Sequence, residues 1–116
     1  TIGFNSSQFN AIALIYAHFP APIKSTIHRA LDHYLCPGGI IIFEAFSKQH
    51  VHYQVKNAQV GGPKELDMLF SIDEIQADFP NYEYLILEEK EIELNEGEFH
   101  KGIGSVIRFV GKKKLH

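Results

Sequence analysis

Two continuous apolar runs, joined by an amphipathic helix, constrain this chain more than any other feature. The first run spans residues 11–16, and the second begins at Ile40 and continues to Phe46. Strands that are covered on both faces read as unbroken hydrophobic stretches rather than as alternating ones. The two runs and the segment between them therefore predict a βαβ unit with two parallel strands and a right-handed crossover.

The crossover is predicted to be a helix from Pro22 to Leu35, because its apolar residues recur at helical spacing. This stripe consists of Ile23, Ile27, Ala30, Leu31 and Tyr34. Lys24 and His28 lie off the stripe. Pro22 suits a first helical turn, and Pro37 with the two glycines after it ends the helix ahead of the next strand.

The second half of the chain is predicted to hold one short helix and a pair of strands. No period is sustained over residues 47–70, which suggests a long loop of the kind that is usually functional or disordered. A capping box at Ser71 then starts a helix that ends by Phe79. Residues 82–94 and 104–110 read as strands, and the short polar turn between them predicts an antiparallel pair.

Composition indicates one small domain covering residues 1–116 and excludes several partners. The net charge is −3, and Lys112–Lys114 is the only basic run, so a nucleic-acid partner is not indicated. No apolar run approaches the ~20 residues of a membrane span, and no signal-peptide pattern opens the chain. The single cysteine, Cys36, fits a reducing compartment such as the cytoplasm. The chain opens on Thr1 without Met, and we expect a fragment of a longer protein.

The predicted topology brings two histidines to one edge of the sheet. Ligands of open α/β sheets bind outside the carboxyl ends of parallel strands. His18 follows the first strand, the loop after Phe46 follows the second, and His100 lies in the last turn. We therefore predict a site at this rim. An exposed turn residue remains the alternative for His100, and a hydrogen bond to a strand end remains the alternative for His18.

Other residues have a functional and a plain structural interpretation. Glu44, near the end of the second apolar run, is either a site residue or the point where the strand leaves the core. Tyr53 and Gln54 in the long loop are candidates for substrate contact. His50 and His52 alternate in sequence, as metal ligands can, but no third ligand has suitable spacing. We therefore assign no metal.

Several segments together resemble the C-terminal half of S-adenosylmethionine-dependent methyltransferases. The resemblance rests on residues 9–16, the Leu-Cys-Pro-Gly-Gly-Ile segment at 35–40, Glu44-Ala45-Phe46, Gly61-Gly62-Pro63 and residues 96–102. Within that superfamily the chain looks closest to small tellurite-resistance-type bacterial methyltransferases. The resemblance implies an α/β fold: a partial Rossmann-like sheet of three parallel strands and one antiparallel C-terminal strand, with crossover helices.

The resemblance also implies a cofactor, S-adenosyl-L-methionine, and roles for particular residues. Three residues would face the methionine end of the cofactor: Ile15, Tyr16 and Ala17. His18 would lie near the transferred methyl group. His100 matches the histidine of a Glu-Leu-His segment in tellurite-type enzymes, with Lys101 in place of an arginine; both would serve the substrate, a small-molecule methyl acceptor.

The Gly-rich cofactor loop and the acidic ribose-binding residue of such enzymes are absent before Ala11. By this resemblance the chain is the substrate-side half of a cytoplasmic enzyme, and the isolated chain should be inactive. The alternative is a non-enzymatic α/β interaction module built on half of that scaffold. In either case the 11–16 strand would form an exposed apolar edge, so we expect self-association through it or coverage by another segment.

Overall fold

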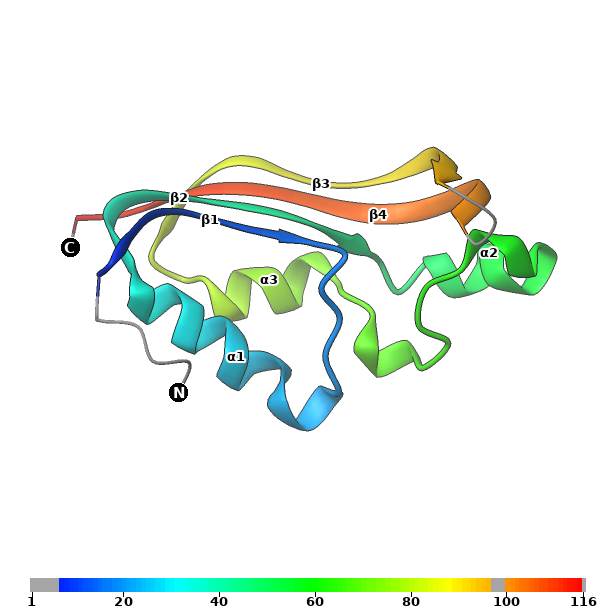
Figure 1. The fold of residues 1–116 in the computed structure, drawn as a ribbon, viewed down its shortest axis with the longest axis horizontal. Helices are drawn as coiled ribbons and strands as arrows, with labels where there is room; N and C mark the ends of the chain where they lie inside the picture. The colour runs from blue at the N-terminus through cyan, green and yellow to red at the C-terminus, as the bar shows by residue number, and fades with distance from the viewer. Residues whose placement is uncertain (1–6, 97–99, 116) are drawn as a thin grey trace.

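The computed structural model describes residues 7–96 and 100–115, except for the side chains of residues 96, 100 and 101. In chain order the elements are β1 (Phe9–Ile15), α1 (Ala21–Tyr34), β2 (Leu35–Phe46), α2 (His50–Lys56), the 3₁₀ turns η1 (Ala58–Val60) and η2 (Leu66–Met68), α3 (Ile72–Asp78), β3 (Tyr82–Glu96) and β4 (His100–Lys113). Figure 1 shows one sheet with α1 and α3 along one face and α2 at one end. None of the described helices is long and apolar enough to cross a membrane.

The four strands form a mixed sheet in the order β1-β2-β4-β3. β1 and β2 are parallel, while β4 runs antiparallel to both β2 and β3. The strands β1, β2 and β3 therefore share one direction, and the C-terminal strand is inserted between two of them in the opposite direction. This confirms the predicted fold class of three parallel strands and one antiparallel strand.

The βαβ unit is confirmed, but its second strand begins earlier than predicted. Leu35, predicted to end the helix, and residues 36–39, predicted to be a break, form the amino end of this strand, and Leu35 pairs with Phe9. The irregularity appears instead as a register shift between Phe9 and Ala11. Gly38 has φ +84°, a conformation that glycine adopts without the steric strain of a side chain.

The predicted buried stripe of α1 is partly wrong. Tyr34 is buried as expected, but Ile23 is 46% exposed, and the other two buried residues of α1 are Lys24 and His28. Polar side chains can be buried when partners satisfy them. η2 and α3 supply those partners here, and this contact between distant segments is invisible to the helical period alone.

The ammonium group of Lys24 is the centre of this contact. Its Nζ donates to the carbonyl oxygens of Asp67 and Leu69, each at 2.8 Å, and to Glu74 Oε2 at 2.7 Å. The same nitrogen lies 4.5 Å from the centroid of the Phe70 ring. Lys24 is 7% exposed, so these groups replace most of its hydration. It joins α1 to the end of the long excursion between β2 and α3.

That excursion, residues 47–70, is more regular than predicted. It contains α2 and the two single-turn helices η1 and η2, so the expectation of an irregular loop is wrong. The side chain of Asn57 accepts a hydrogen bond from the Gln59 N–H and caps η1. Each helix is too short to show a sustained period, which explains why the pattern was missed.

Of the two hydrogen bonds in the capping box predicted for α3, the one to Ser71 is confirmed. Ser71 Oγ accepts from the Glu74 N–H at 3.2 Å, as an N-cap serine should. The carboxylate of Glu74, however, binds Lys24 and Lys48 at 2.7 and 3.0 Å. The capping box therefore contributes its serine to the helix and its glutamate to the contact between helices.

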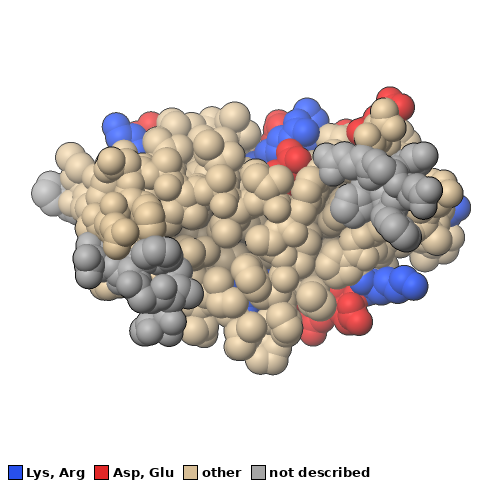
Figure 2. Space-filling model, in the orientation of Figure 1, with Lys and Arg blue, Asp and Glu red and all other residues tan. Residues whose placement is uncertain are grey.

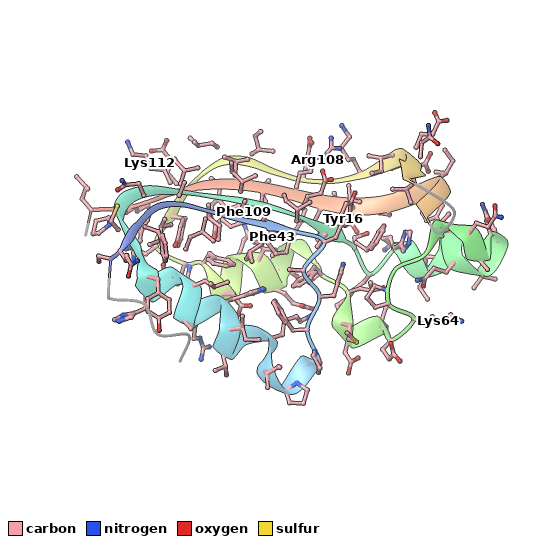
Figure 3. All side chains as sticks on the ribbon, in the orientation of Figure 1. Tyr16, Phe43, Lys64, Arg108, Phe109 and Lys112 are labelled. Carbon is pink, nitrogen blue, oxygen red and sulfur yellow. The ribbon has the colours of Figure 1, made fainter. Side chains whose placement is uncertain are left out.

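The hydrophobic core lies between the sheet and the helices α1 and α3. Figure 3 shows Phe43 and Phe109 pointing toward the helices, whereas Arg108 and Lys112 point to the opposite side of the sheet. Phe43 and Phe109 are register partners on β2 and β4, and their ring centroids are 6.4 Å apart. The buried members of this core cluster are Leu35, Ile41, Phe43, Ala45, Phe70, Ile75, Phe79, Tyr82, Ile107 and Phe109.

The β3–β4 hairpin is longer than predicted. The two strands pair from Tyr82–Lys113 to Glu96–His100, so the polar segment 95–102 belongs largely to the strands. The turn itself, residues 97–99, lies outside the described residues. Val106 is the first residue of β4 in chain order that pairs with β2. The part of the hairpin before it on β4, toward the turn, pairs only with β3 and has no partner from β1 or β2.

We expect Lys24→Met to lower the free energy of unfolding by about 2–3 kcal/mol, because it leaves buried carbonyl oxygens without a donor. Urea denaturation followed by circular dichroism would measure this. Lys112→Met is the matched control: Lys112 is exposed, and its replacement should change stability by less than about 0.5 kcal/mol. Equal effects for the two variants would contradict the role of Lys24.

Candidate functional site

The carboxyl ends of β1 and β2 meet at a rim where the backbone turns sharply at Tyr16. This residue has φ +54°, an uncommon conformation for a bulky aromatic residue. Its N–H donates to the carbonyl oxygen of Glu44 at 2.6 Å, and its ring lies 4.9 Å from that of Phe46. Such strain costs about 1–3 kcal/mol and tends to cluster at functional sites. The outlier makes this rim the first candidate site.

His18 lies at the same rim, with both ring nitrogens bonded to backbone groups. Nδ1 lies 3.0 Å from the carbonyl oxygen of Met68, and the N–H of Phe46 donates to Nε2 at 3.3 Å. A carbonyl can only accept and an N–H can only donate, so Nδ1 carries the proton and the imidazole is neutral. Burial lowers the pKa of His18, outweighing the opposing effect of the Met68 carbonyl, and nearby Lys24 lowers it further.

This geometry limits what His18 can do chemically. Its basic nitrogen, Nε2, already accepts from Phe46, so it could take a proton from a substrate only after that bond is released. The alternative that we gave from the sequence, a hydrogen bond at a strand end, describes the observed contacts. A direct role of His18 in proton transfer remains a prediction.

Glu44 leaves the rim on the side of the sheet away from the helices. Its carboxylate binds Arg108 Nε on β4, and the side chain of Glu44 is 22% exposed. Glu44 also pairs in register with Ile15, which is 53% exposed. A charged pair and an exposed apolar residue therefore stand side by side at the open end of β1.

The two predicted site residues of the last turn lie elsewhere along the sheet. His100 and Lys101 begin β4, and their side chains lie outside the described residues. Val106 of β4 is the register partner of Phe46 at the rim. His100 lies six residues earlier on β4, which at the usual strand rise is a distance of about 20 Å along the strand. The described backbone thus does not bring His100 close to His18.

Tyr53 borders a groove of about 550 Å³ between α2 and the hairpin. Its hydroxyl donates to Glu91 Oε2 on β3, and this bond raises the pKa of the phenol. The groove lining is polar and consists of Gln49, His52, Tyr53, Lys56, Glu89, Lys90, Glu91 and Ser105. A polar ligand suits this lining better than an apolar one.

Gln54, the neighbouring candidate, serves the backbone instead. Its Nε2 lies 3.0 Å from the Gly61 carbonyl oxygen, 3.3 Å from that of Gly62 and 2.8 Å from that of Pro63. Gly61 and Gly62 have φ +70° and +84°, which glycine adopts without strain, and the Gln54 amide is the donor for the carbonyl oxygens of this turn. The residue also lines a second, more apolar hollow of about 290 Å³ with Val51, Val55 and Lys64.

His50, whose spacing from His52 suggested only a metal ligand, connects α2 to the Gly61 turn and to β4. Its Nε2 bonds the Gly61 carbonyl at 3.0 Å, and the N–H of Ser105 donates to its Nδ1 at 3.2 Å. The ring stacks on Phe46 with a centroid separation of 4.1 Å. Within the described ranges no group of three or more potential ligands could hold a metal ion. A histidine at the start of a short helix gives no sequence signal for such a contact.

A further histidine, His28, is buried between α1 and α3. Its Nδ1 lies 2.8 Å from Asp78 Oδ2, and Ser25 Oγ donates to the other carboxylate oxygen at 2.8 Å. The ring is fully buried against Phe70 and Phe79. Burial lowers the pKa of His28 despite the contrary effect of Asp78. This site supports the core and lies on the opposite side of it from the open face.

The side of the sheet away from α1 and α3 carries exposed apolar residues. Ile42, Leu85 and Ile86 are 44–51% exposed, and Ile15 is on the same side at the β1 edge. Figure 2 shows acidic and basic side chains along the upper margin, above this side of the sheet. The continuous apolar runs predicted strands that are covered on both faces. The described residues differ from this prediction, because α1 and α3 cover only one face of the sheet.

Among the solved structures with a similar fold are S-adenosylmethionine-dependent methyltransferases. One from Methanosarcina mazei overlays 100% of this chain and 64% of its own with a TM-score of 0.67 and 17% identity. One from Anabaena variabilis overlays 90% and 48% with a TM-score of 0.62 and 16% identity. The N-methyltransferase NodS from Bradyrhizobium japonicum overlays 97% and 55% with a TM-score of 0.58 and 9% identity. The sequence matches no family model and no curated protein.

The chain therefore has a methyltransferase-like fold and spans 48–64% of the length of these three structures. At such low identity the likeness concerns the arrangement of strands and helices alone.

We expect the free energy of unfolding to fall as the pH drops below about 6.5, because the pKa values of His18 and His28 are lower in the folded chain than in the unfolded chain. The unfolded state then binds more protons, with a slope of up to about 1.4 kcal/mol per pH unit for each histidine. Urea titrations between about pH 8 and 5 measure the slope.

His28→Gln keeps a neutral donor for Asp78 and should flatten this pH dependence. His33→Gln is the control, since His33 is exposed and should leave the slope unchanged. A His28→Gln slope equal to the wild-type slope would show that burial of this ring is not a cause.

Proposed function

We propose that this chain is the C-terminal, substrate-side half of an S-adenosylmethionine-dependent methyltransferase that acts on a small molecule. The observation that carries the proposal is the strand order β1-β2-β4-β3 with a single reversed strand, overlaid over 90–100% of this chain on such methyltransferases. The exposed edge of β1 is where the sheet would continue into a cofactor-binding half.

The residues at the carboxyl end of β1 fit one side of the cofactor. Ile15 is half-exposed at the sheet edge, and the turn at Tyr16 presents backbone groups and an aromatic ring at the same point. An apolar side chain and an aromatic ring suit a methionine-like chain with a sulfonium. In this proposal Ile15, Tyr16 and Ala17 bind that end of S-adenosyl-L-methionine, and the rest of the cofactor is held outside the described residues.

The cofactor supplies the methyl group, and the protein supplies position and charge. Methyl transfer from a sulfonium is an in-line displacement, in which holding the acceptor close and aligned contributes most. The strained turn at Tyr16 is fixed by its bond to Glu44, and Phe46 packs behind it. This rigid wall would orient the donor, while His18 keeps the wall attached to the end of β2.

Binding of the methyl acceptor is assigned to the polar groups around this wall. Glu44 on the open side of the rim and Tyr53 in the groove offer charge and a hydroxyl, and Gln54 shapes the turn beside it. The tellurite-type assignment, with His100 and Lys101 contacting the substrate, rests on the sequence motif at residues 96–102. The backbone of His100 lies about 20 Å along β4 from the partner of Phe46, so in that scheme the end of the hairpin must move toward the wall before His100 acts as the proton acceptor.

The alternative is a non-enzymatic interaction module on the same half-scaffold. One observation favours it: both nitrogens of His18 are occupied by backbone groups, so the rim histidine is not a ready base. The enzyme proposal accommodates this if His18 only positions the wall. A cytoplasmic location belongs to the proposal as well, supported by the single free cysteine, Cys36.

We expect the isolated chain to bind S-adenosylhomocysteine more weakly than about 100 μM, because most contacts to such a cofactor would come from another half. Calorimetric titration tests the affinity. Two-dimensional NMR at millimolar ligand should show amide shifts confined to Ile15, Tyr16 and Ala17 and their neighbours. Tyr16→Ala should abolish them, whereas Tyr53→Phe, a change in the groove beyond Phe46, should not.

Micromolar binding by the isolated chain would overturn the assignment of the cofactor site to two halves. Shifts centred on the α2 groove would move the cofactor away from β1. Either result leaves the fold unchanged, so it would bear on function alone.

The edge of β1 is the proposed site of self-association or of pairing with another chain. The N–H of Tyr16 points inward to β2, so strand alternation turns the backbone groups of Ala11, Ala13 and Ile15 outward. The strand from Phe9 to Ile15 contains no proline or charged residue that would block an edge.

We expect association in sedimentation velocity at concentrations above about 100 μM, through this edge. Ala13→Pro removes one outward N–H and should give a monomer while leaving the β1–β2 ladder intact. Ile42→Lys changes the open face at the register partner of Ala13 but leaves the outward backbone groups of β1 in place, so this variant should still associate. If Ile42→Lys dissolves the assembly and Ala13→Pro does not, the face and not the edge is responsible.

A further inference from the structure

Two histidines attach the rim to the sheet in the same chemical way. Each has one ring nitrogen that accepts from a strand N–H and another that bonds a carbonyl of the excursion. His18 joins Phe46 N–H of β2 to Met68 C=O, and His50 joins Ser105 N–H of β4 to Gly61 C=O. Both rings also stack on Phe46, at centroid separations of 5.7 and 4.1 Å.

The partners fix opposite tautomers in the two rings. His18 must carry its proton on Nδ1, facing the Met68 carbonyl, and His50 must carry it on Nε2, facing the Gly61 carbonyl. The remaining nitrogen of each ring has to be an unprotonated acceptor, because a backbone N–H points at it. Both attachments therefore exist only for neutral imidazoles.

We propose that His18 and His50 form a proton-sensitive double clamp that ties the β1–α1 segment and α2 to the ends of β2 and β4 when neutral and releases these strand contacts when protonated. Protonation places a second N–H against the Phe46 or the Ser105 N–H, so the two donors face each other. The carbonyl sides of the clamp survive, because an imidazolium still donates. The rim would move with the excursion, away from the strands.

The surrounding positive charges oppose a proton on His18 while the clamp is closed, so the strand contact should open once the proton binds. Around His18 the ionisable neighbours are Lys24 of α1, paired with Glu74 of α3, and His50 of α2. His50 stacks with Tyr53, whose hydroxyl binds Glu91 of β3. β2 and β4 present Phe46 and Ser105 to the clamp, which are not ionisable. A charge on one imidazole thus meets a buried ammonium and a second histidine, and burial lowers the pKa of His18.

The consequence reaches beyond the proposed transfer reaction and does not depend on it. Tyr16, Phe46 and the turn at Gly61 are all held by this clamp or packed on it. Acidification to about pH 5 would loosen the rim while the core between the sheet and α1 and α3 stays folded. Any ligand bound at the rim would then be released in acid.

Hydrogen exchange tests the clamp at its two strand donors. Protection factors, corrected for the intrinsic rate at each pH, should fall at least tenfold for the Phe46 and Ser105 amides between about pH 7.5 and 5. Those of Ile107 and Phe109, in the β4 core, should fall less than threefold. An unchanged protection at Phe46 and Ser105, or an equal fall throughout the sheet, would overturn the proposal.

Variants separate titration from mere packing. Glutamine offers one donor and one acceptor and does not titrate, so His18→Gln and His50→Gln should each flatten the pH dependence at their own strand donor. His52→Gln is the matched control, since His52 is exposed on the same helix as His50. Glutamine variants with the wild-type pH dependence would refute the clamp.

A measurement on the wild-type chain is available if a variant fails to fold. The nitrogen chemical shifts of the imidazoles at about pH 7.5 should show His18 with its proton on Nδ1 and His50 with its proton on Nε2. The same tautomer in both rings, or a mixture in either, would contradict the hydrogen bonds on which the proposal rests.

Discussion

The pairing of β2 with two strands of opposite direction is the constraint on which the rest of the structure depends. β2 is parallel to β1 on one side and antiparallel to β4 on the other. Its alternate residues Ile41, Phe43 and Ala45 are buried beneath α1 and α3. A slip of one residue would turn these side chains to the open face and Ile42 and Glu44 into the core. The register of this strand therefore fixes which face holds the core and where the rim lies.

Much of this arrangement follows from local patterns in the sequence. The apolar run at 11–16, the Pro-Gly-Gly segment before Ile40 and the serine at position 71 each act through their own neighbours. For that reason β1, the apolar part of β2 and the serine cap of α3 were predicted correctly, whereas residues 36–39 were predicted to break the chain ahead of the strand and in fact belong to β2. The direction of β4 also followed from the short connection between two strands.

The contacts that a pattern could not predict all join distant segments. Lys24 and His28 lie on the buried side of α1 because carbonyl and carboxylate groups some fifty residues later meet them. Ile23 is exposed in consequence, although it has the correct helical spacing. The helices of the excursion are stabilised by such contacts more than by propensity. Sequence therefore located the rim through strand ends, and it missed the clamp role of His50.

His18 shows that a histidine at the carboxyl end of a parallel strand need not be available for proton transfer. His18 stands where a parallel sheet presents its ligands, and its ring has the surroundings of a perturbed titratable group. Its two backbone bonds nevertheless use the lone pair that a general base would need. Position at a strand end and altered proton affinity are thus insufficient to assign proton transfer, and the partner atoms decide the role.

The ammonium of Lys24 and the imidazole of His18 together recognise three successive peptide carbonyls, those of Asp67, Met68 and Leu69. A carbonyl is present whatever the side chain, so evolution can replace the outward-facing residues there without losing the attachment. A comparison of orthologues would then show a variable residue at position 67 opposite invariant residues at positions 18 and 24, whereas the fully buried Leu69 would stay apolar. When a side chain binds a backbone carbonyl, only the residue that supplies the side chain needs to be conserved. The sequence of the segment that supplies the carbonyl then gives no sign of the contact.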